Sequence, residues 1–347
     1  MNEVIDEIAV PYRPDVAGLR FRHFEGPADY PGMVAASQAS RDEAGIEEVI
    51  TVEAISRAYS HLVNCDLTQD MVVVERDRAI IGYARVEWRE LVDGRRSFMT
   101  VCILQPAQRG QGIGRALLAW SEDRLAAKAA ALPAGPEGAM DAYTWGNDDH
   151  AISLFEKQGW SRNGYGFEMV RPTLDDIPEV PLPDGLEVRP MTLDDRERVW
   201  WASVDAFRDH RLEPEPTPED LAEFLEDSRQ DPSLWAVAFD GDEVAGGVLG
   251  LIDRDENEHH GRQRGLLDSV FTRAGWRRRG LARALIARTL VLLRDRGMTS
   301  AYLGVDGLNP NQAQTLYASL GFEIVSSTID WTKPLPRHEP VAGGPNP

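Results

Sequence analysis

Residues 266–296 read LLDSVFTRAGWRRRGLARALIARTLVLLRDR, and the organisation of the whole chain can be worked out from them. The β-branched and aromatic run at 267–272 predicts a buried strand. After a short turn, Leu281, Leu285 and Leu292 recur at helical spacing with no proline between them, which predicts a helix. The sequence therefore predicts a helix that follows a buried strand through a short basic loop.

The loop 277–282, RRRGLA, has the composition of an anion site. The first turn of a helix leaves backbone N–H groups unpaired and carries the positive end of the helix dipole. Gly280 and Ala282 are small enough to let a bulky anion approach that backbone, and the arginines suit phosphate oxygens. We therefore interpret the loop as a diphosphate cradle, although an ordinary strand-to-helix turn with a solvated basic rim has the same local pattern.

The chain contains this unit twice. Residues 109–114 (RGQGIG) correspond to 277–282, residues 18–22 to 185–189, and residues 155–160 to 317–322, all in one order and at spacings of 162 to 168 residues. Four prolines at 172–185 predict an extended linker between the repeats. We expect an N-terminal domain at 1–172, a linker at 173–184, a C-terminal domain at 185–334 and a disordered, Pro/Gly-rich tail at 335–347.

Composition excludes several classes of protein. The 347 residues are 42% apolar and 27% charged, which is typical of two globular domains. Cys65 and Cys102 are too few for a disulfide framework or a metal cluster, and the polar stretch 253–264 reads as a solvated loop without metal-ligand spacing. There is no signal-peptide pattern and no membrane-length apolar run, so we expect a cytoplasmic protein. A net charge of −20 argues against nucleic-acid partners and favours cationic substrates such as amines.

Each repeat interleaves helices and hairpins with one strand–loop–helix crossover, which predicts an α/β fold with a mixed sheet. The element order, the R-x-x-G-x-A loop and the segment 305–322, VDGLNPNQAQTLYASLGF, resemble the GNAT acetyltransferase superfamily. The resemblance implies two tandem GNAT-like domains, each a mixed, mostly antiparallel sheet flanked by helices. It also implies acetyl-CoA as co-substrate and N-acetylation of an amine on a small molecule or peptide. A tandem with one competent C-terminal domain is similar to the mycothiol synthases.

The same resemblance implies roles for residues of the second repeat. Tyr317 would be the general acid that protonates the departing thiolate, since a phenol with a pKa of about 10 stays protonated at neutral pH. Asp268 would be the general base, with Asp306 as the reserve candidate; the alternative for Asp268 is a strand-end carboxylate paired with an arginine. Asn309 would hydrogen-bond the pantetheine arm.

Further residues would hold the rest of the co-substrate. By the resemblance, the backbone of Val270, Phe271 and Thr272 would pair with pantetheine like an added strand and place an N–H near the thioester carbonyl. The residues expected to bind the diphosphate are Arg277, Arg278, Arg279, Gly280, Leu281, Ala282 and Arg283.

The first repeat departs from this pattern at two positions. Phe155 stands where Tyr317 stands in the second repeat, and Thr100 stands where Asp268 does. Its cradle is intact and comprises Arg109, Gly110, Gln111, Gly112, Ile113 and Gly114. We expect this domain to be a scaffold or to bind acyl-CoA without catalysis, rather than to be a second active site.

Three other functions can be weighed from the sequence alone, and two of them stay open. The chain could be a non-catalytic acyl-CoA-binding regulator, or an acyltransferase with a hydroxyl acceptor. A dinucleotide-dependent oxidoreductase is disfavoured, because Arg115 stands where the last glycine of G-x-G-x-x-G belongs. The acceptor, the acyl chain and the oligomeric state do not follow from the sequence.

Overall fold

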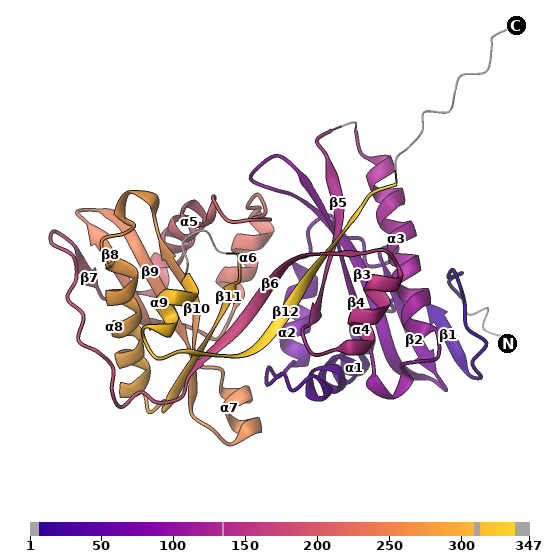
Figure 1. Cartoon of the computed structure of the whole chain (residues 1–347), viewed down its shortest axis with the longest axis horizontal. Helices are drawn as coiled ribbons and strands as arrows, with labels where there is room; N and C mark the ends of the chain where they lie inside the picture. Colours follow the sequence, from indigo (N-terminus) through magenta and orange to yellow (C-terminus); the bar gives the residue numbers. More distant parts are fainter. Residues whose placement is uncertain (1–6, 134, 309–312, 337–347) are drawn as a thin grey trace, which may run out of the picture.

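The computed structural model describes residues 7–133, 135–308 and 313–336 (Figure 1). The N-terminal half contains β1 (Leu19–Arg22), α1 (Tyr30–Glu43), α2 (Val52–Ser60), β2 (Met71–Arg76), β3 (Ala79–Glu90), β4 (Arg96–Leu104), α3 (Ile113–Ala131), β5 (Gly138–Trp145), α4 (Asp149–Lys157) and β6 (Ser161–Arg171). The C-terminal half contains β7 (Glu187–Arg189), α5 (Arg196–Phe207), α6 (Pro218–Glu226), β8 (Gln230–Asp240), β9 (Glu243–Leu251), α7 (Arg254–His260), β10 (Arg264–Thr272), α8 (Leu281–Asp295), β11 (Ser300–Asp306), α9 (Ala313–Ala318) and β12 (Glu323–Pro334). Short 3-10 turns are η1 (Pro27–Asp29), η2 (Pro106–Gln108), η3 (Leu193–Asp195) and η4 (Ala274–Trp276).

All twelve of these strands form one sheet, in the order β1-β2-β3-β4-β5-β12-β6-β11-β10-β9-β8-β7. Only β4–β5 and β10–β11 are parallel, because α3 and α8 each return the chain to the same end of the sheet before the next strand. Every other pair of neighbours is antiparallel. The expected mixed, mostly antiparallel α/β fold with flanking helices is therefore confirmed.

The two halves exchange their last strands. The C-terminal strand β12 lies between β5 and β6 of the N-terminal half, and β6 pairs in turn with β11 of the C-terminal half. Figure 1 shows β6 and β12 running side by side across the middle of the molecule. The exchange reaches the cores as well: Ile329 and Trp331 of β12 pack in the N-terminal core, and Met169 of β6 packs in the C-terminal core. Neither half thus completes its sheet or its core without the other.

Helices cover both faces of the sheet. Along a strand, successive side chains point to opposite faces, and both sets pack against helices. On β2, Met71 and Val73 pack with α1 and α2, whereas Val72 and Val74 pack with α3. A strand whose side chains are buried on both faces has a continuous apolar sequence. Residues 71–74 of β2, MVVV, are such a run. In the C-terminal half, β8 divides in the same way between α5 on one face and α8 on the other.

The expectation of a solvated loop at 253–264 was wrong. Residues Arg254–His260 form α7, whose N-terminus is capped by Asp253 accepting from the backbone N–H of Glu256. Acidic residues in its first turn and histidines in its last turn match the helix dipole. The segment lacks apolar periodicity, because its buried side chains, Glu256 and Asn257, are held by polar contacts to Arg264. No described helix is both long and apolar enough to cross a membrane.

Candidate active site

The predicted cradle lies at the N-terminus of α8. Gly280 is the N-cap residue, with φ 83° in the left-handed region, and Arg278 before it has φ 58°. No side chain caps the helix, so its first backbone N–H groups are left for another acceptor. A cavity of about 350 Å³, here called the cradle pocket, opens beside them and is lined by Gly280, Leu281, Ala282 and Arg283 among others. The geometry is that of an anion site at a helix start.

The three consecutive arginines have different surroundings. The Nε of Arg277 donates to the Thr272 carbonyl at 2.9 Å, and its guanidinium pairs with Asp209, so this side chain ties the end of α5 to the end of β10. Arg279 donates to the Asp184 carbonyl at 3.3 Å. Arg278 lines the cradle pocket and forms no ion pair with any described residue. Of the three, Arg278 is therefore the side chain best placed to meet a phosphate.

The strand that precedes the cradle has an open edge. The parallel ladder between β10 and β11 ends at Leu266, which pairs with Tyr302, and β10 continues to Thr272 with β9 as its only strand partner among the described residues. Val270, Phe271 and Thr272 line the cradle pocket along this stretch. The Thr272 carbonyl accepts from Arg277, and an extended ligand would pair with other backbone groups of this edge as an added strand would.

A β-bulge interrupts β10 at Asp268. Leu267 pairs with Gly250 and Ser269 with Leu249, so Asp268 is an extra residue with no partner on β9. The Asp268 side chain lines a second cavity of about 830 Å³ between the two halves, here called the central cavity. The side chain is solvent-accessible there, yet protein surrounds the group closely enough for burial to raise its pKa, against an opposing effect of Arg229.

Tyr317 of α9 lines the cradle pocket. Its side chain is 5% exposed, lines the cradle pocket with Val270, and packs edge-on against Phe322 at 6.1 Å between ring centroids. Burial raises the pKa of the phenol to about 12, so it stays protonated over the whole physiological range. Asp268 and Tyr317 thus line two different cavities, and residues of β10 line both. Asn309 lies outside the described residues.

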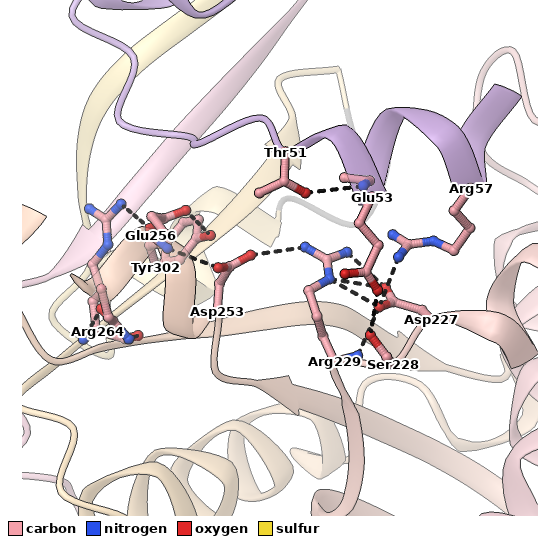
Figure 2. Close-up of polar contacts among 12 residues, drawn as sticks. Thr51, Glu53, Arg57, Asp227, Ser228, Arg229, Asp253, Glu256, Arg264 and Tyr302 are labelled. Atoms are coloured by element: carbon pink, nitrogen blue, oxygen red, sulfur yellow. Dashed lines mark hydrogen bonds and ion pairs between the residues drawn. The ribbon is translucent and has the colours of Figure 1, made fainter. Parts of the chain in front are cut away.

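Several polar residues of the central cavity were missed by the sequence analysis. Figure 2 shows Arg57 of α2 reaching Asp227, which also holds Arg229, and shows Arg229 reaching Asp253. Glu168 of β6 lines the same cavity, and so does Asp306 of β11, which the sequence analysis named as the reserve candidate for the base. These residues come from helix ends and strands in both halves, so no local sequence pattern brings them together. Among the described residues, no group of three His, Cys, Asp or Glu side chains is arranged to hold a metal ion.

The N-terminal half contains the related cradle, but among its described residues it lacks the β-bulge and the cavity-lining carboxylate that accompany the cradle of the C-terminal half. Gly110 and Gly112 have φ of 76° and 86°, as Arg278 and Gly280 do in the other half. A cavity of about 320 Å³ is lined there by Arg109, Gly110, Gly112 and Gly114, while Gln111 bonds Arg76 and Ile113 is buried in the core. However, Arg109 is paired with Asp148 at 2.8 Å, the β3–β4 ladder has no bulge, and Thr100 is buried.

Comparison with known proteins agrees with this geometry. Residues 197–322 match the acetyltransferase (GNAT) family, and residues 68–162 match a GNAT acetyltransferase domain. Mycothiol acetyltransferase of Nocardiopsis dassonvillei is 29% identical over 258 residues, which span 67% of this chain and 73% of that protein. The mycothiol acetyltransferase of Salinispora tropica is 27% identical over 313 residues, 84% of this chain and 94% of that protein.

Solved structures share the fold. A GCN5-related N-acetyltransferase from Sphaerobacter thermophilus superposes with a TM-score of 0.69 at 24% identity, over 93% of this chain and 96% of that one. A tandem GNAT protein from the clavulanic acid biosynthesis pathway superposes with a TM-score of 0.64 at 15% identity, over 92% and 100%. At these identities the likeness concerns the fold alone. Together, the two family matches and the two cradles establish that the chain belongs to the GNAT acetyltransferase family and carries two GNAT domains in tandem.

Proposed function

We propose that the C-terminal half transfers an acetyl group from acetyl-CoA to an amine by direct attack. The observation that carries this proposal is the position of Asp268 and Val270 on one strand. The bulge directs Asp268 into the central cavity, while Val270 lines the cradle pocket two residues further on. A donor in the cradle pocket and an acceptor in the central cavity would meet at this strand.

In this proposal, the donor is held by backbone N–H groups and by the Arg278 side chain. The N–H groups of the first turn of α8 and the Arg278 guanidinium would bind the diphosphate, as charged acceptors favour both kinds of donor. The unpaired edge of Val270, Phe271 and Thr272 would hold the pantetheine arm, and Asn309 keeps its proposed place on that arm. A backbone N–H of this edge would then lie near the thioester carbonyl, where negative charge develops in the transition state.

Asp268 is the proposed general base. An alkylammonium cannot attack a carbonyl, and an amine with a pKa of about 10.4 is almost fully protonated at neutral pH. Burial raises the pKa of Asp268, and a carboxylate with a raised pKa is a better proton acceptor than an ordinary one. Asp268 would take one proton from the ammonium, directly or through water, before the nitrogen lone pair attacks the thioester carbon, and the second nitrogen proton would leave to solvent from the tetrahedral intermediate.

Tyr317 is the proposed general acid. As the tetrahedral intermediate collapses, the carbon–sulfur bond breaks and the thiolate leaves with the electron pair. Tyr317 would donate its proton to that sulfur and regain one from solvent. Its elevated pKa supports the assignment, because the phenol carries its proton at every pH at which the enzyme would work.

The charges of the central cavity support a cationic acceptor. Its four arginines are all paired: Arg41 with Glu48, Arg57 with Asp227, Arg85 with Glu87, and Arg229 with Asp227 and Asp253. By contrast, none of the ion pairs among the described residues includes Asp268 or Glu168. Uncompensated carboxylates in an enclosed site favour an ammonium group. Since relatives at 27–29% identity are named mycothiol acetyltransferases, an amine related to mycothiol is the first acceptor to test.

We further propose that the N-terminal half is not catalytic. It has Phe155 in place of the acid, Thr100 in place of the base, and no bulge to turn a side chain at that point into a cavity. Its cradle could still bind acyl-CoA. We also keep the division into domains at 1–172 and 185–334 with a linker at 173–184 as a proposal; in the fold, β6 and β12 cross this boundary.

The proposal is tested by measuring how fast CoA is released from acetyl-CoA. The free thiol of the released CoA is titrated over time. The purified protein is incubated with a panel of amines, including a mycothiol-related amine, glucosamine, ethanolamine and putrescine, and with alcohols of matched skeleton. We expect amine-dependent release that Asp268→Asn and Tyr317→Phe each reduce about 10²-fold or more, with acetyl-CoA binding retained. Turnover with alcohols alone would replace the amine by a hydroxyl acceptor. Calorimetric binding of acetyl-CoA with no turnover would favour a regulator, and no binding would overturn the proposal.

A further inference from the structure

Arg229 lines the central cavity together with Asp268, and two carboxylates hold its guanidinium. Arg229 donates to Asp227 through Nε at 3.0 Å and Nη2 at 2.7 Å, and to Asp253 through Nη1 at 3.1 Å. Asp227 is the C-cap residue of α6, and Asp253 is the N-cap residue of α7. The planar guanidinium is therefore held in one orientation between the ends of two helices, as Figure 2 shows.

The N-terminal half completes this arrangement. Arg57 of α2 pairs with Asp227 at 3.5 Å, and Ser228 donates to Glu53 of α2 at 3.3 Å. The segment 227–229 is thus held by the half that lacks the proposed catalytic residues. Fixing a long arginine side chain costs conformational entropy, and three carboxylate contacts on two sides offset that cost.

The sheet brings Arg229 to the same end of the cavity as Asp268. Leu251 of β9 pairs with Gln230 on one side and with Leu266 on the other, so the residue before Gln230 and the bulge after Leu267 lie at the same end of the two strands that flank β9. Both side chains line the central cavity. No ion pair joins them directly, which leaves the space between them for an acceptor or for water.

We propose that Arg229 is a positioning residue for Asp268: Asp227 and Asp253 hold its guanidinium in the central cavity, α2 of the N-terminal half fixes Asp227 in turn, and the charge held there favours the ionised form of the Asp268 carboxyl. This inference rests on the proposed role of Asp268 as base. Arg57 and Arg229 together balance Asp227 and Asp253, so the loss of Arg229 would leave three carboxylates with one cation. Arg229 lowers the pKa of Asp268 and Asp227 raises it, in agreement with that balance.

Other ionisable groups share this environment and bear on any pH dependence. Those on the elements around Asp268 are Arg57 of α2, Asp227 and Arg229 before β8, Asp253 and Glu256 at α7, Glu168 of β6, and Tyr302 and Asp306 of β11. Glu256 is already paired with Arg262 and Arg264 and accepts from Tyr302 at 3.1 Å. The experiment must therefore isolate the Arg229–Asp268 pair from its neighbours.

A double-mutant cycle on the full chain does so without a known acceptor. Denaturant unfolding is measured for the wild type, Arg229→Gln, Asp268→Asn and the double variant at neutral pH and near pH 3. We expect Arg229→Gln to lower the unfolding midpoint more when Asp268 is present than when Asn stands there, and this difference to vanish at low pH, where the carboxyl is neutral. Arg229→Lys is expected to restore most of the coupling, because it keeps the charge.

Kinetics then separate this inference from the proposed function. With whichever amine of the panel is turned over, the acid limb of kcat/KM is expected to move to higher pH in Arg229→Gln, while acetyl-CoA binding stays unchanged. The positioning role would be overturned if Arg229→Gln lowered kcat/KM by the same factor at all pH values. It would also be overturned if the double-mutant cycle gave no coupling energy between Arg229 and Asp268 at neutral pH. If Asp268→Asn kept full activity while the cycle still showed coupling, Asp268 would not be the base. The electrostatic interaction between Arg229 and Asp268 would then stand without the proposed catalytic role.

Discussion

Trp331, in the last strand of the chain, stacks on Phe155 of the N-terminal half with ring centroids 5.4 Å apart and an interplanar angle of 26°. Its indole N–H donates to the Thr144 hydroxyl at 2.9 Å, and the side chain is only 1% exposed. A residue from one repeat therefore fills the core of the other. This contact explains why the two halves form one continuous sheet rather than two bodies joined by a flexible linker.

Trp331→Ala is expected to destabilise the N-terminal half, although the substitution lies in the C-terminal repeat. Truncation of a buried tryptophan costs about 3–5 kcal/mol through lost burial and a residual cavity. Denaturant unfolding followed by circular dichroism measures the loss. Val325→Ala is the matched control, because Val325 is 56% exposed on the same strand and should change the free energy of unfolding by less than about 0.5 kcal/mol. Equal effects of the two variants would argue against the exchange of strands.

Tyr317→Phe tests the proposed acid without removing the ring that packs against Phe322. We expect acetyl-CoA binding within about twofold of wild type and a fall in kcat of roughly 10²–10⁴-fold, the usual range for a general acid. Because burial raises the pKa of Tyr317 to about 12, the wild-type rate should show no loss from this phenol below pH 10. Tyr30→Phe is the control, since Tyr30 is equally buried on α1 and lines none of the cavities described above. A descending limb near neutral pH that disappears in Tyr317→Phe would contradict the raised pKa.

The sequence predicts the elements well where apolar periodicity and caps are strong. The strand expected at 267–272 lies within β10, and the helix expected after the basic loop is α8. The prediction was wrong for α7, where polar contacts to Arg264 rather than an apolar face hold the helix in place. The exchange of β6 and β12 could not be predicted, because both pairings satisfy the same alternation of side chains. For the site, the cradles are local motifs, whereas the clamp around Arg229 depends on tertiary structure alone.

Arg278→Gly separates the charge of the cradle from its backbone shape. Arg278 has φ 58°, a conformation that costs an L-residue about 1–2 kcal/mol and that glycine takes at Gly110 in the other half. We expect the variant to be as stable as the wild type or slightly more so, and to bind CoA roughly 10-fold to 100-fold more weakly, because a hydrogen bond to a charged group is worth about 1.5–3 kcal/mol. Calorimetry with pantetheine, which lacks the diphosphate, is the control and should give unchanged affinity. A loss for both ligands would mean that the loop itself was disturbed.

Gly304 offers a way to fill the central cavity while leaving the proposed catalytic groups in place. It lies in β11, pairs with Glu168 of β6, and an added Cβ would meet no atom within 4 Å. Since φ is not positive and β-branched residues suit strands, Gly304→Ala and Gly304→Val are expected to fold at least as stably as the wild type. We expect KM for the amine to rise with side-chain size, while the affinity for acetyl-CoA in the cradle pocket stays constant. Unchanged kinetics in Gly304→Val would place the acceptor elsewhere.

Glu213 is expected to make the contact between the halves sensitive to pH. Its backbone carbonyl accepts from Val92, and Glu215 donates to Glu90, so this segment extends the edge of the N-terminal hairpin. Burial raises the pKa of Glu213 from 4.5 to about 7, while Arg89, which partly opposes the shift, is already paired with Asp220. Between pH 4.5 and 7 the folded chain retains a proton that the unfolded chain has released, so this group makes stability fall as the pH rises through that window. Glu213→Gln cannot ionise, and its Tm relative to wild type should therefore rise from pH 5 to pH 8, whereas exposed Glu219→Gln should show a constant difference. A constant difference for Glu213→Gln as well would show that this carboxyl has an ordinary pKa and that the contact between the halves does not respond to it.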